Sequence, residues 1–393
     1  MKTYPFARIG LILFSALLLF YCASSSGGIG GTGFVSRGTI SAFGSLVVNG
    51  NELDTSRAVI IVSGQNVGTG DGVAQDYLEI GMVVTVEGRQ NTKTDTAVAS
   101  RVRYNQNIAG PVEDIRDIDV ITREILVLGQ TVIVNTVTQF KETTFDTIAL
   151  DDVVAVSGLV DDTGTLWATF FEKTAEFIPG STVEVVGLVA NLDTDLESFE
   201  INDLVIDYSM ADTGGLPGGV PVEGQMVEVE GRLDAAGGQL FATEIKLSDE
   251  LGIEDAYAME VTGFVTNFVS AAEFTIDQQL VQTSAQTLYV DGEPADIALG
   301  ARLEAEGRLV EGILYASEIE FWQPDQIEVE GIVTDIASVS EFTVGNQVVQ
   351  TDAATVFEDG TPDDIVLGVL IEVKGVPIDI ERSVILADKV SFE

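Results

Sequence analysis

The sequence predicts an all-β protein made of five tandem small antiparallel β-barrels, OB-like or Greek-key in type, each about 70 residues long. Three observations predict this fold class. Apolar and polar residues alternate over short runs rich in Val, Ile, Phe and Thr, as in half-buried strands. Turn residues interrupt these runs roughly every 8 to 12 residues. Two glycine-containing motifs each recur five times at nearly constant spacing, which indicates one structural unit built repeatedly.

The first element, residues 1–22, is expected to be a lipoprotein-type signal peptide. Lys2 and Arg8 precede the apolar run IGLILFSALLLFYC, and polar sequence follows abruptly. A basic start with an apolar stretch too short to span a bilayer is typical of an export signal. Cys22 at this boundary resembles a lipoprotein box, in which the cysteine is acylated and anchors the protein to a membrane. Tyr21 stands where a small residue is usual, so a secreted protein remains the alternative.

Residues 23–34 are expected to form a flexible Gly/Ser linker behind that anchor. The anchor places the protein in the bacterial cell envelope, as an outer-membrane lipoprotein that faces the periplasm or the cell surface.

The strand motif EVEGRL at 228–233 returns as EAEGRL at 304–309 and as VEGR at 86–89. Aligned over the whole chain, the motif ends five times in a glycine, with spacings of 70, 73, 76 and 68 residues. These glycines are Gly88, Gly158, Gly231, Gly307 and Gly375.

A second glycine series gives the same period, with spacings of 72, 77, 76 and 68 residues. Its members are Gly38, Gly110, Gly187, Gly263 and Gly331. Two independent series therefore divide the chain into β repeats at 35–106, 107–178, 179–252, 253–323 and 324–393.

These glycines fall on the apolar side of the predicted strands, as Gly187 does between Val185 and Val189. A glycine that points inward takes no side-chain room and tolerates a bulged or strongly bent backbone. We therefore expect the ten glycines to mark bends that let short strands curl across a small barrel. The alternative, a glycine that only ends its strand in a turn, explains Gly231 but not Gly187.

Aromatic residues recur at one point of the unit. Phe199, Phe274 and Phe342 each lead a short strand, and core packing explains them. The other aromatic residues considered are less regular, and they would stack on glycans if they lay exposed on one barrel face. They are Trp167, Trp322, Tyr289 and Tyr315.

Composition excludes several classes of function. The 63 acidic residues outnumber 19 basic ones and give a formal charge of −44, which repels phosphate backbones and so argues against nucleic-acid binding. Histidine is absent, which removes the usual general base and the commonest transition-metal ligand. The single cysteine rules out an internal disulfide. We therefore expect a protein that is not an enzyme and holds no cofactor.

Two carboxylate pairs are candidate catalytic groups: Glu228 with Glu230, and Glu304 with Glu306. Each pair lies on one face of its strand, about 7 Å apart, near the separation used by inverting glycosidases. Other copies do not keep both carboxylates, so a solvated outer face is the favoured interpretation, and a hydrolase would need a uniquely buried pair.

Two acidic loops are candidate calcium sites, NLDTDLE at 191–197 and DDTG at 161–164. Neither has the spacing of an EF-hand loop. Asp and Asn also favour hairpin turns through local backbone hydrogen bonds. No metal ligand is therefore assigned to either loop.

The linker GTG followed by GTISAFGSLVVNGNELDT, together with the repeated V-x-G-x-V, L-x-x-G and V-E-V-x-G elements, carries a family resemblance. The chain resembles the bacterial domain of unknown function 5666 repeat family, over nearly all of residues 30–393. The second copy departs from the pattern with Pro111 and the charged segment EDIRDID. The resemblance implies tandem small β-barrels in an exported lipoprotein-like protein, and it implies no reaction or catalytic residue.

The expected function is a non-enzymatic spacer or interaction array in the cell envelope, since repeated modules gain avidity without any single strong site. Its expected partners are a membrane, through Cys22, and glycans or envelope proteins. The alternative is an array of carbohydrate-binding or Ca²⁺-binding modules, which predicts exposed aromatic or carboxylate clusters at equivalent positions of several copies.

Overall fold

The computed structural model describes residues 33–43, 46–91, 96–135, 137–234, 238–248, 255–322, 327–345, 347–379 and 384–392. The predicted signal peptide (1–22), Cys22 and all of the predicted linker but residues 33 and 34 lie outside the described residues. Within the described part of the chain, no helix is both long and apolar enough to cross a membrane.

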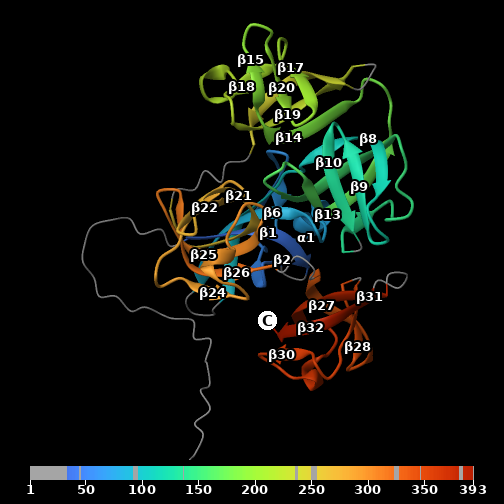
Figure 1. The fold of residues 1–393 in the computed structure, drawn as a ribbon, viewed down its shortest axis with the longest axis vertical. Helices are drawn as coiled ribbons and strands as arrows, with labels where there is room; N and C mark the ends of the chain where they lie inside the picture. The colour runs from blue at the N-terminus through green and yellow to red at the C-terminus, as the bar shows by residue number, and fades with distance from the viewer. Residues whose placement is uncertain are drawn as a thin grey trace, which may run out of the picture. The chain divides into compact units, whose positions relative to one another are not determined.

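The described chain folds into five small barrels, each formed by one continuous stretch of sequence and so by one range of colour in Figure 1. The barrels span 33–104, 108–176, 182–247, 256–321 and 327–392. Their strands are short because turns close after a few residues of alternating sequence, and the one α-helix among them has only 7 residues.

The bounds of the elements are as follows. The first barrel contains β1 (Gly33–Ala42), β2 (Leu46–Val48), β3 (Asn51–Asp54), β6 (Val83–Asn91) and β7 (Thr96–Tyr104), with β4 (Val59–Val62), β5 (Gln65–Thr69) and α1 (Asp71–Tyr77) inserted before β6. The second contains β8 (Ile108–Asp117), β9 (Thr122–Val127), β10 (Gln130–Asn135), β12 (Asp152–Val160) and β13 (Leu166–Glu176), with β11 (Gln139–Lys141) before β12. The third contains β14 (Thr182–Leu188) with its continuation β15 (Ala190–Asp193), β16 (Ser198–Ile201), β17 (Leu204–Asp207), β19 (Met226–Leu233) and β20 (Gln239–Leu247), with β18 (Asp212–Gly215) and the 3₁₀ turn η1 (Pro217–Gly219) before β19.

The fourth barrel contains β21 (Ala256–Ser270), β22 (Glu273–Ile276), β23 (Gln279–Gln282), β25 (Arg302–Val310) and β26 (Ile313–Phe321), with β24 (Leu288–Val290) and η2 (Pro294–Asp296) before β25. The fifth contains β27 (Ile327–Ser338), β28 (Glu341–Val344), β29 (Gln347–Gln350), β31 (Leu370–Asp379) and β32 (Val384–Phe392), with β30 (Val356–Glu358) and η3 (Pro362–Asp364) before β31. Below, the first to fifth strands of a barrel are the five main strands in chain order.

All five barrels close in the same way. The first strand pairs with the second and the fourth, the second pairs with the third, and the fourth pairs with the fifth, all antiparallel, as in the fifth barrel. The third strand completes the ring by pairing with the fifth. This five-stranded barrel has the OB-like order expected from the sequence.

Parallel pairings with the fifth strand correct the expectation of antiparallel structure throughout. A short strand inserted before the fourth strand pairs with the fifth in parallel in every barrel. The third and fifth strands run parallel in every barrel, as β29 and β32 do with Val348 opposite Val384. The reason is geometric: strand direction cannot alternate all the way round a closed ring with an odd number of strands.

The barrel interiors are filled by the alternating apolar residues of these strands. Phe199, Phe274 and Phe342 lead equivalent second strands, and each is only 1% exposed. The prediction that core packing explains these three residues is confirmed. Phe274 and Phe342 lie in the apolar clusters of barrels 4 and 5, and Phe199 lies in a cluster that barrels 2 and 3 share.

The five glycines that end the strand motif all occupy the same special position. In each barrel the register between the fourth and fifth strands shifts at this glycine, which marks a β-bulge. A Cβ added there would lie 2.1 to 2.4 Å from a backbone carbonyl oxygen of the fifth strand. Such contacts leave no room for any side chain. The glycines are Gly88, Gly158, Gly231, Gly307 and Gly375.

The second glycine series lies on the first strand of each barrel and faces side chains of the following hairpin. A Cβ added to Gly187 would lie 2.3 Å from the Ile201 side chain, whereas at Gly331 the nearest atom, of Val344, is 3.3 Å away. The fit at Gly38 and Gly110 is as tight as at Gly187, against Asn49 and Leu128, and at Gly263 the Ile276 side chain is 3.0 Å away. The absence of a side chain at these glycines therefore makes room for the hairpin side chains, and it does not mark a bulge.

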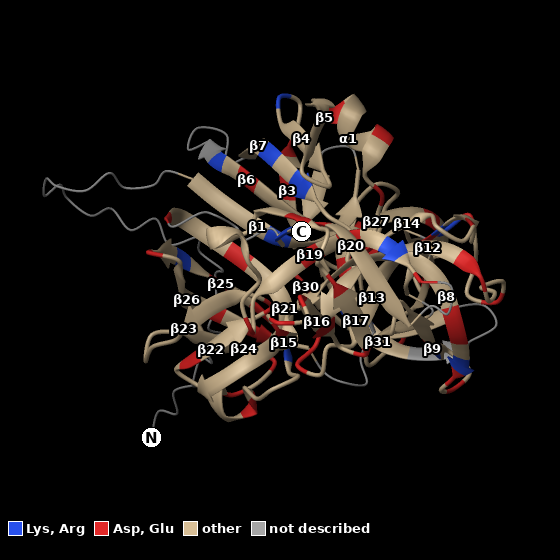
Figure 2. Ribbon diagram, turned by 90° about the horizontal axis from the view of Figure 1, so that it is seen from above, with Lys and Arg blue, Asp and Glu red and all other residues tan. Residues whose placement is uncertain are grey.

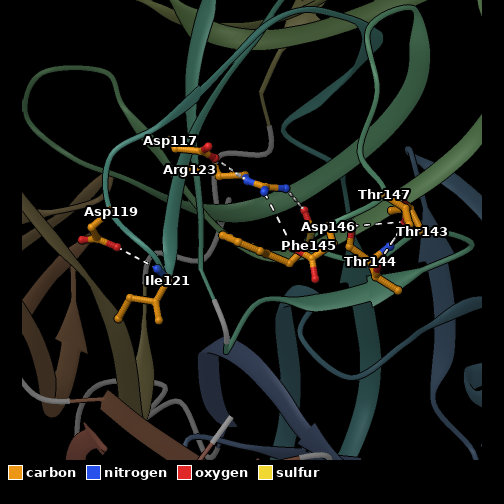
Figure 3. Close-up of polar contacts among 9 residues, drawn as sticks. All are labelled: Asp117, Asp119, Ile121, Arg123, Thr143, Thr144, Phe145, Asp146 and Thr147. Atoms are coloured by element: carbon orange, nitrogen blue, oxygen red, sulfur yellow. Dashed lines mark hydrogen bonds and ion pairs between the residues drawn. The ribbon is translucent and has the colours of Figure 1, made fainter. Parts of the chain in front are cut away.

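The charged segment that distinguishes the second copy serves a structural purpose. Figure 3 shows the Arg123 side chain between the end of β8 and the loop 143–147. Its Nε lies 2.7 Å from Asp117 Oδ1, its Nη1 donates to the Phe145 carbonyl oxygen, and its guanidinium carbon is 4.3 Å from the centre of the Phe145 ring. Arg123 therefore ties the β8–β9 hairpin to that loop.

The bulge geometry predicts the effect of a single methyl group. Gly231→Ala places a Cβ against the Phe241 carbonyl oxygen, so we expect barrel 3 to lose about 2–3 kcal/mol of stability. Hydrogen exchange of peptides from β19 and β20, measured by mass spectrometry, gives the local stability.

Gly238→Ala is the matched control in the same barrel, because its Cβ would have no neighbour within 4 Å among the described residues. We expect this variant to exchange as the wild type does. Equal protection of β19 in the two variants would contradict the account of the bulge.

Candidate functional site

The outer face of barrel 3 gathers several carboxylates on adjacent strands. Glu184 lies on β14 directly opposite Glu230 on β19, and Glu228 on β19 lies opposite Lys246 on β20. Because side chains two residues apart in a strand share a face, Glu228 and Glu230 point to the same side. Acidic residues occur throughout the rest of the chain as well, and they far outnumber basic ones (Figure 2).

The expectation of a solvated face is wrong at this place. Glu228 is only 1% exposed and Glu184 only 7% exposed. For Glu184 the cause is pairing between barrels: β8 of barrel 2 pairs with β14, which puts Ala109 opposite Glu184. This position on the outside of barrel 3 is thus covered by the preceding barrel.

The three carboxylates of this face lie within reach of one another. One oxygen each of Glu184, Glu228 and Glu230 can be chosen so that all three lie within 4.8 Å of one another. Gln106 Nε2 donates to Glu184 Oε2 at 3.0 Å, and Lys246 Nζ lies 2.7 Å from Glu228 Oε1. Burial, reinforced by the charge of Glu228, raises the pKa of Glu184 to about 7.

Barrel 4 carries a second carboxylate cluster at the equivalent positions, Glu260 on β21 with Glu304 and Glu306 on β25. Here hydroxyl and amide groups donate hydrogen bonds to the carboxylates. Glu304 Oε2 accepts a hydrogen bond from Thr262 at 2.9 Å, and Glu260 Oε2 accepts from Ser36 at 3.2 Å. The side chain of Asn51 also donates to Glu260, at 2.9 Å.

Burial is also the main cause of the raised pKa values in this cluster. Burial and the charge of Glu320 raise the pKa of Glu304 to about 7, although the hydrogen bond from Thr262 opposes the shift. Burial and the charge of Glu304 raise the pKa of Glu260 well above its usual range. Glu260 and Glu304 are only partly buried and Glu306 is exposed, so the buried carboxylates that sequence reasoning did not expect are Glu184 and Glu228 of barrel 3.

In the other three barrels, the positions equivalent to Glu228 and Glu230 carry other side chains or other ion pairs. In barrel 1, Arg101 and Arg103 lie 3.0 and 2.8 Å from Glu87. In barrel 5, Lys374 lies 3.0 Å from Glu372 and also contacts Glu320 of barrel 4. In barrel 2, a serine, Ser157, takes the place of the second glutamate and accepts a hydrogen bond from the Val83 amide.

The two acidic loops weighed as calcium sites are turns. Asp193 Oδ1 accepts hydrogen bonds from the backbone amides of residues 195 and 196, each at 2.9 Å. Asp161 Oδ1 accepts from the amides of Thr163 and Thr165, at 2.9 and 3.0 Å. These hydrogen bonds favour the turn interpretation of both loops.

Three exposed aromatic side chains occupy one equivalent position on the fifth strand of barrels 2, 3 and 4. Trp167 is 40% exposed, and Phe241 and Tyr315 are each 47% exposed. Sequence reasoning considered Trp167 and Tyr315 but missed Phe241. The signal was the shared pattern of an aromatic residue between a buried apolar residue and alanine, LWA, LFA and LYA.

The two remaining aromatic residues are partly covered by their own barrel. Tyr289 packs against Phe321, with ring centres 6.4 Å apart. Trp322 stacks on the guanidinium group of Arg302, 3.3 Å from the ring centre. Neither residue belongs to the exposed series.

Comparison with known proteins gives a family and no activity. A family model described as a domain of unknown function, DUF5666, matches residues 109–172, 186–246, 262–320 and 330–391. No curated protein matches the chain significantly. Among solved structures, one named "drosophila Unr CSD456" is 15% identical over 53% of this chain and 96% of its own, with a TM-score of 0.13, too low to bear on fold or function.

The raised pKa of Glu304 predicts a pH dependence of stability. A carboxyl group whose pKa is higher in the folded state than in the unfolded state stabilises the fold below the unfolded pKa. That contribution is lost as pH rises from about 4.5 to about 7, and its upper limit is about 3 kcal/mol. The charged groups around Glu304 are Glu260, Glu320 and Glu372.

Glu304→Gln should therefore flatten the loss of stability between pH 5 and pH 8. Urea unfolding followed by fluorescence measures it, in a Trp167→Phe background so that Trp322, stacked on Arg302 of β25, is the reporter. Glu311→Gln, an exposed position in the β25–β26 turn, is the control. An unchanged pH profile in Glu304→Gln would refute the assignment.

Proposed function

The chain belongs to the family of the domain of unknown function DUF5666, and we propose that it is an exported, non-enzymatic interaction array of the bacterial cell envelope. The observation that carries this proposal is the fivefold repetition of one barrel whose closing glycines stay the same while its outer face changes. Repetition with altered surfaces suits a protein that presents several contact sites.

The N-terminal sequence supports the proposed location. A basic start, an apolar run and Cys22 at a polar boundary together favour export followed by lipid anchoring. We place the mature protein on the outer membrane, facing the periplasm or the cell surface, with secretion as the alternative. The charge of −44 suits a role away from nucleic acids and anionic lipid headgroups.

Composition supports a role without catalysis. The sequence lacks histidine, and its single cysteine lies in the signal region. Glu184 of barrel 3, which is buried, and Glu260 of barrel 4, which is partly buried, lie on strands that pair with a strand of another barrel. Groups held at such joints favour a structural or ligand-holding role over the turnover of a bulky substrate.

A second candidate function, glycan binding, is favoured by the exposed aromatic series. Phe241 lies opposite Arg232 on the neighbouring strand, and Tyr315 lies opposite Arg308 in the same register. An aromatic face beside a guanidinium group offers both stacking and hydrogen-bond donors, and OB-type barrels bind oligosaccharides. Equivalent places on several barrels would add avidity.

Anchoring through Cys22 predicts lipid incorporation. In a bacterial host fed a labelled fatty acid, we expect the wild type to carry label and to partition into detergent, and Cys22→Ser to lose both properties. Tyr21→Ala, which supplies the usual small residue, should raise the processed fraction. Unlabelled wild-type protein in the culture medium would contradict anchoring and favour secretion.

Glycan binding predicts a loss specific to the aromatic series. On a glycan array, we expect Phe241→Ala and Tyr315→Ala to weaken binding by about tenfold each, as the loss of one stacked ring implies. Tyr257→Ala is the control, because Tyr257 is exposed but lies outside the series. Wild-type binding no greater than background would exclude this second function.

A further inference from the structure

Glu184, Glu228 and Glu230 of barrel 3 are spaced so that one small cation reaches all of them. Their chosen oxygens lie within 4.8 Å of one another. A bound Ca²⁺ lies about 2.3–2.6 Å from each oxygen ligand, so two ligands on opposite sides are up to about 5 Å apart. The strands β14 and β19 therefore already hold the three groups at a suitable distance, without movement of the backbone.

The second observation is a buried oxygen that the protein does not satisfy. Glu184 is 7% exposed, and its Oε2 accepts the hydrogen bond from Gln106. Among the described residues, none donates a hydrogen bond to its other oxygen, Oε1. A buried carboxylate oxygen without a partner is costly, and a cation in the cluster would supply that partner.

Comparison with barrel 4 shows why the cation site falls in barrel 3. In barrel 4 the residue opposite Glu304 is Thr262, whose hydroxyl donates to that carboxylate. In barrel 3 the residue opposite Glu228 is Val186, which has no hydrogen-bonding side chain. The equivalent of Glu184 in barrel 4, Glu260, accepts hydrogen bonds from two side chains of barrel 1. In barrel 4, neutral side chains donate to both Glu304 and Glu260, whereas in barrel 3 Gln106 donates to one oxygen of Glu184 and Glu228 is paired with the ammonium group of Lys246.

The local charge also favours a cation. Three carboxylates of barrel 3 face the single ammonium group of Lys246, which lies 2.7 Å from Glu228 Oε1. In barrel 1 two arginines face Glu87 alone. The face of barrel 3 therefore keeps an excess of negative charge in a buried place, where water screens it weakly.

We propose that Glu184, Glu228 and Glu230 bind one hard divalent cation, with Ca²⁺ as the ion that fits best. Carboxylate oxygens are ligands for Ca²⁺, Mg²⁺ and Mn²⁺ rather than for softer metals. Mg²⁺ demands near-ideal octahedral geometry at about 2.0–2.1 Å and gives up water reluctantly, whereas Ca²⁺ accepts irregular ligand sets. This site is independent of membrane anchoring and of glycan binding.

Lys246 gives the proposal a distinctive consequence. Its ammonium group occupies one oxygen of Glu228, so it repels an incoming cation and competes for the same ligand. Replacing it with a neutral residue of similar length removes that competition. Lys246→Gln should therefore bind Ca²⁺ more tightly than the wild type, an effect that a merely structural role for the cluster would not produce.

Isothermal titration of the full-length mature protein with CaCl₂, after treatment with a chelator and in about 150 mM NaCl to suppress diffuse binding, tests the site. We expect one saturable site, weakened about tenfold or more in Glu184→Gln and Glu228→Gln, and tightened about tenfold in Lys246→Gln. Glu306→Gln in barrel 4 is the matched control and should bind as the wild type does. Titration with MgCl₂ should give weaker binding.

Hydrogen exchange keeps the test decisive if a variant folds poorly. In the wild type, Ca²⁺ should slow the exchange of peptides from β14 and β19 and leave β21 and β25 unchanged. Titration without a saturable site would overturn the proposal, and so would a saturable site that Glu184→Gln and Glu228→Gln leave intact. Protection of β25 in place of β19 would also overturn it.

Discussion

The close approach of the fourth and fifth strands at one glycine is the constraint on which each barrel depends. At this point the fifth strand bulges, with one extra residue opposite the glycine, and the space between Gly307 and the Tyr315 carbonyl oxygen is too small for a methyl group. The bulge bends the strand sharply enough for a short sheet to curve back on itself. Closure then forces the third and fifth strands together in parallel, since five strands cannot alternate around a ring.

Each closed barrel has an outer face, and pairing between barrels determines which positions of that face are covered. β8 pairs with β14, and β1 pairs with β21, so the first strands of barrels 3 and 4 each gain a partner from another barrel. Glu184 and Glu260 lie on these shared strands, where Glu184 is buried and Glu260 is partly buried. Their raised pKa values therefore follow from assembly of the barrels rather than from the fold of one barrel.

The fold of the barrel could be predicted from the sequence, but the burial of the carboxylates at the candidate site could not. Glycine spacing and the buried Phe199, Phe274 and Phe342 depend on short-range alternation and on contacts within one repeat, which a single sequence displays. The burial of Glu184 depends on the pairing of β14 with β8 of barrel 2, and alternation along β14 merely assigns that residue to the outside. The parallel pairing escaped prediction for a related reason, because it arises only when the ring closes.

The five copies also show that the barrel does not itself require acidic residues on this face. The position of Glu228 is held by Ala155 in barrel 2 and by Thr85 in barrel 1, and both barrels close with the same bulge. Buried carboxylates cost free energy unless they are paired, so their presence in barrel 3 calls for a compensating interaction. Lys246 supplies part of it at Glu228, and Gln106 supplies part of it at Glu184. What remains is negative charge held at a distance suited to a divalent ion, and a bound cation accounts for that arrangement more simply than closure of the barrel does.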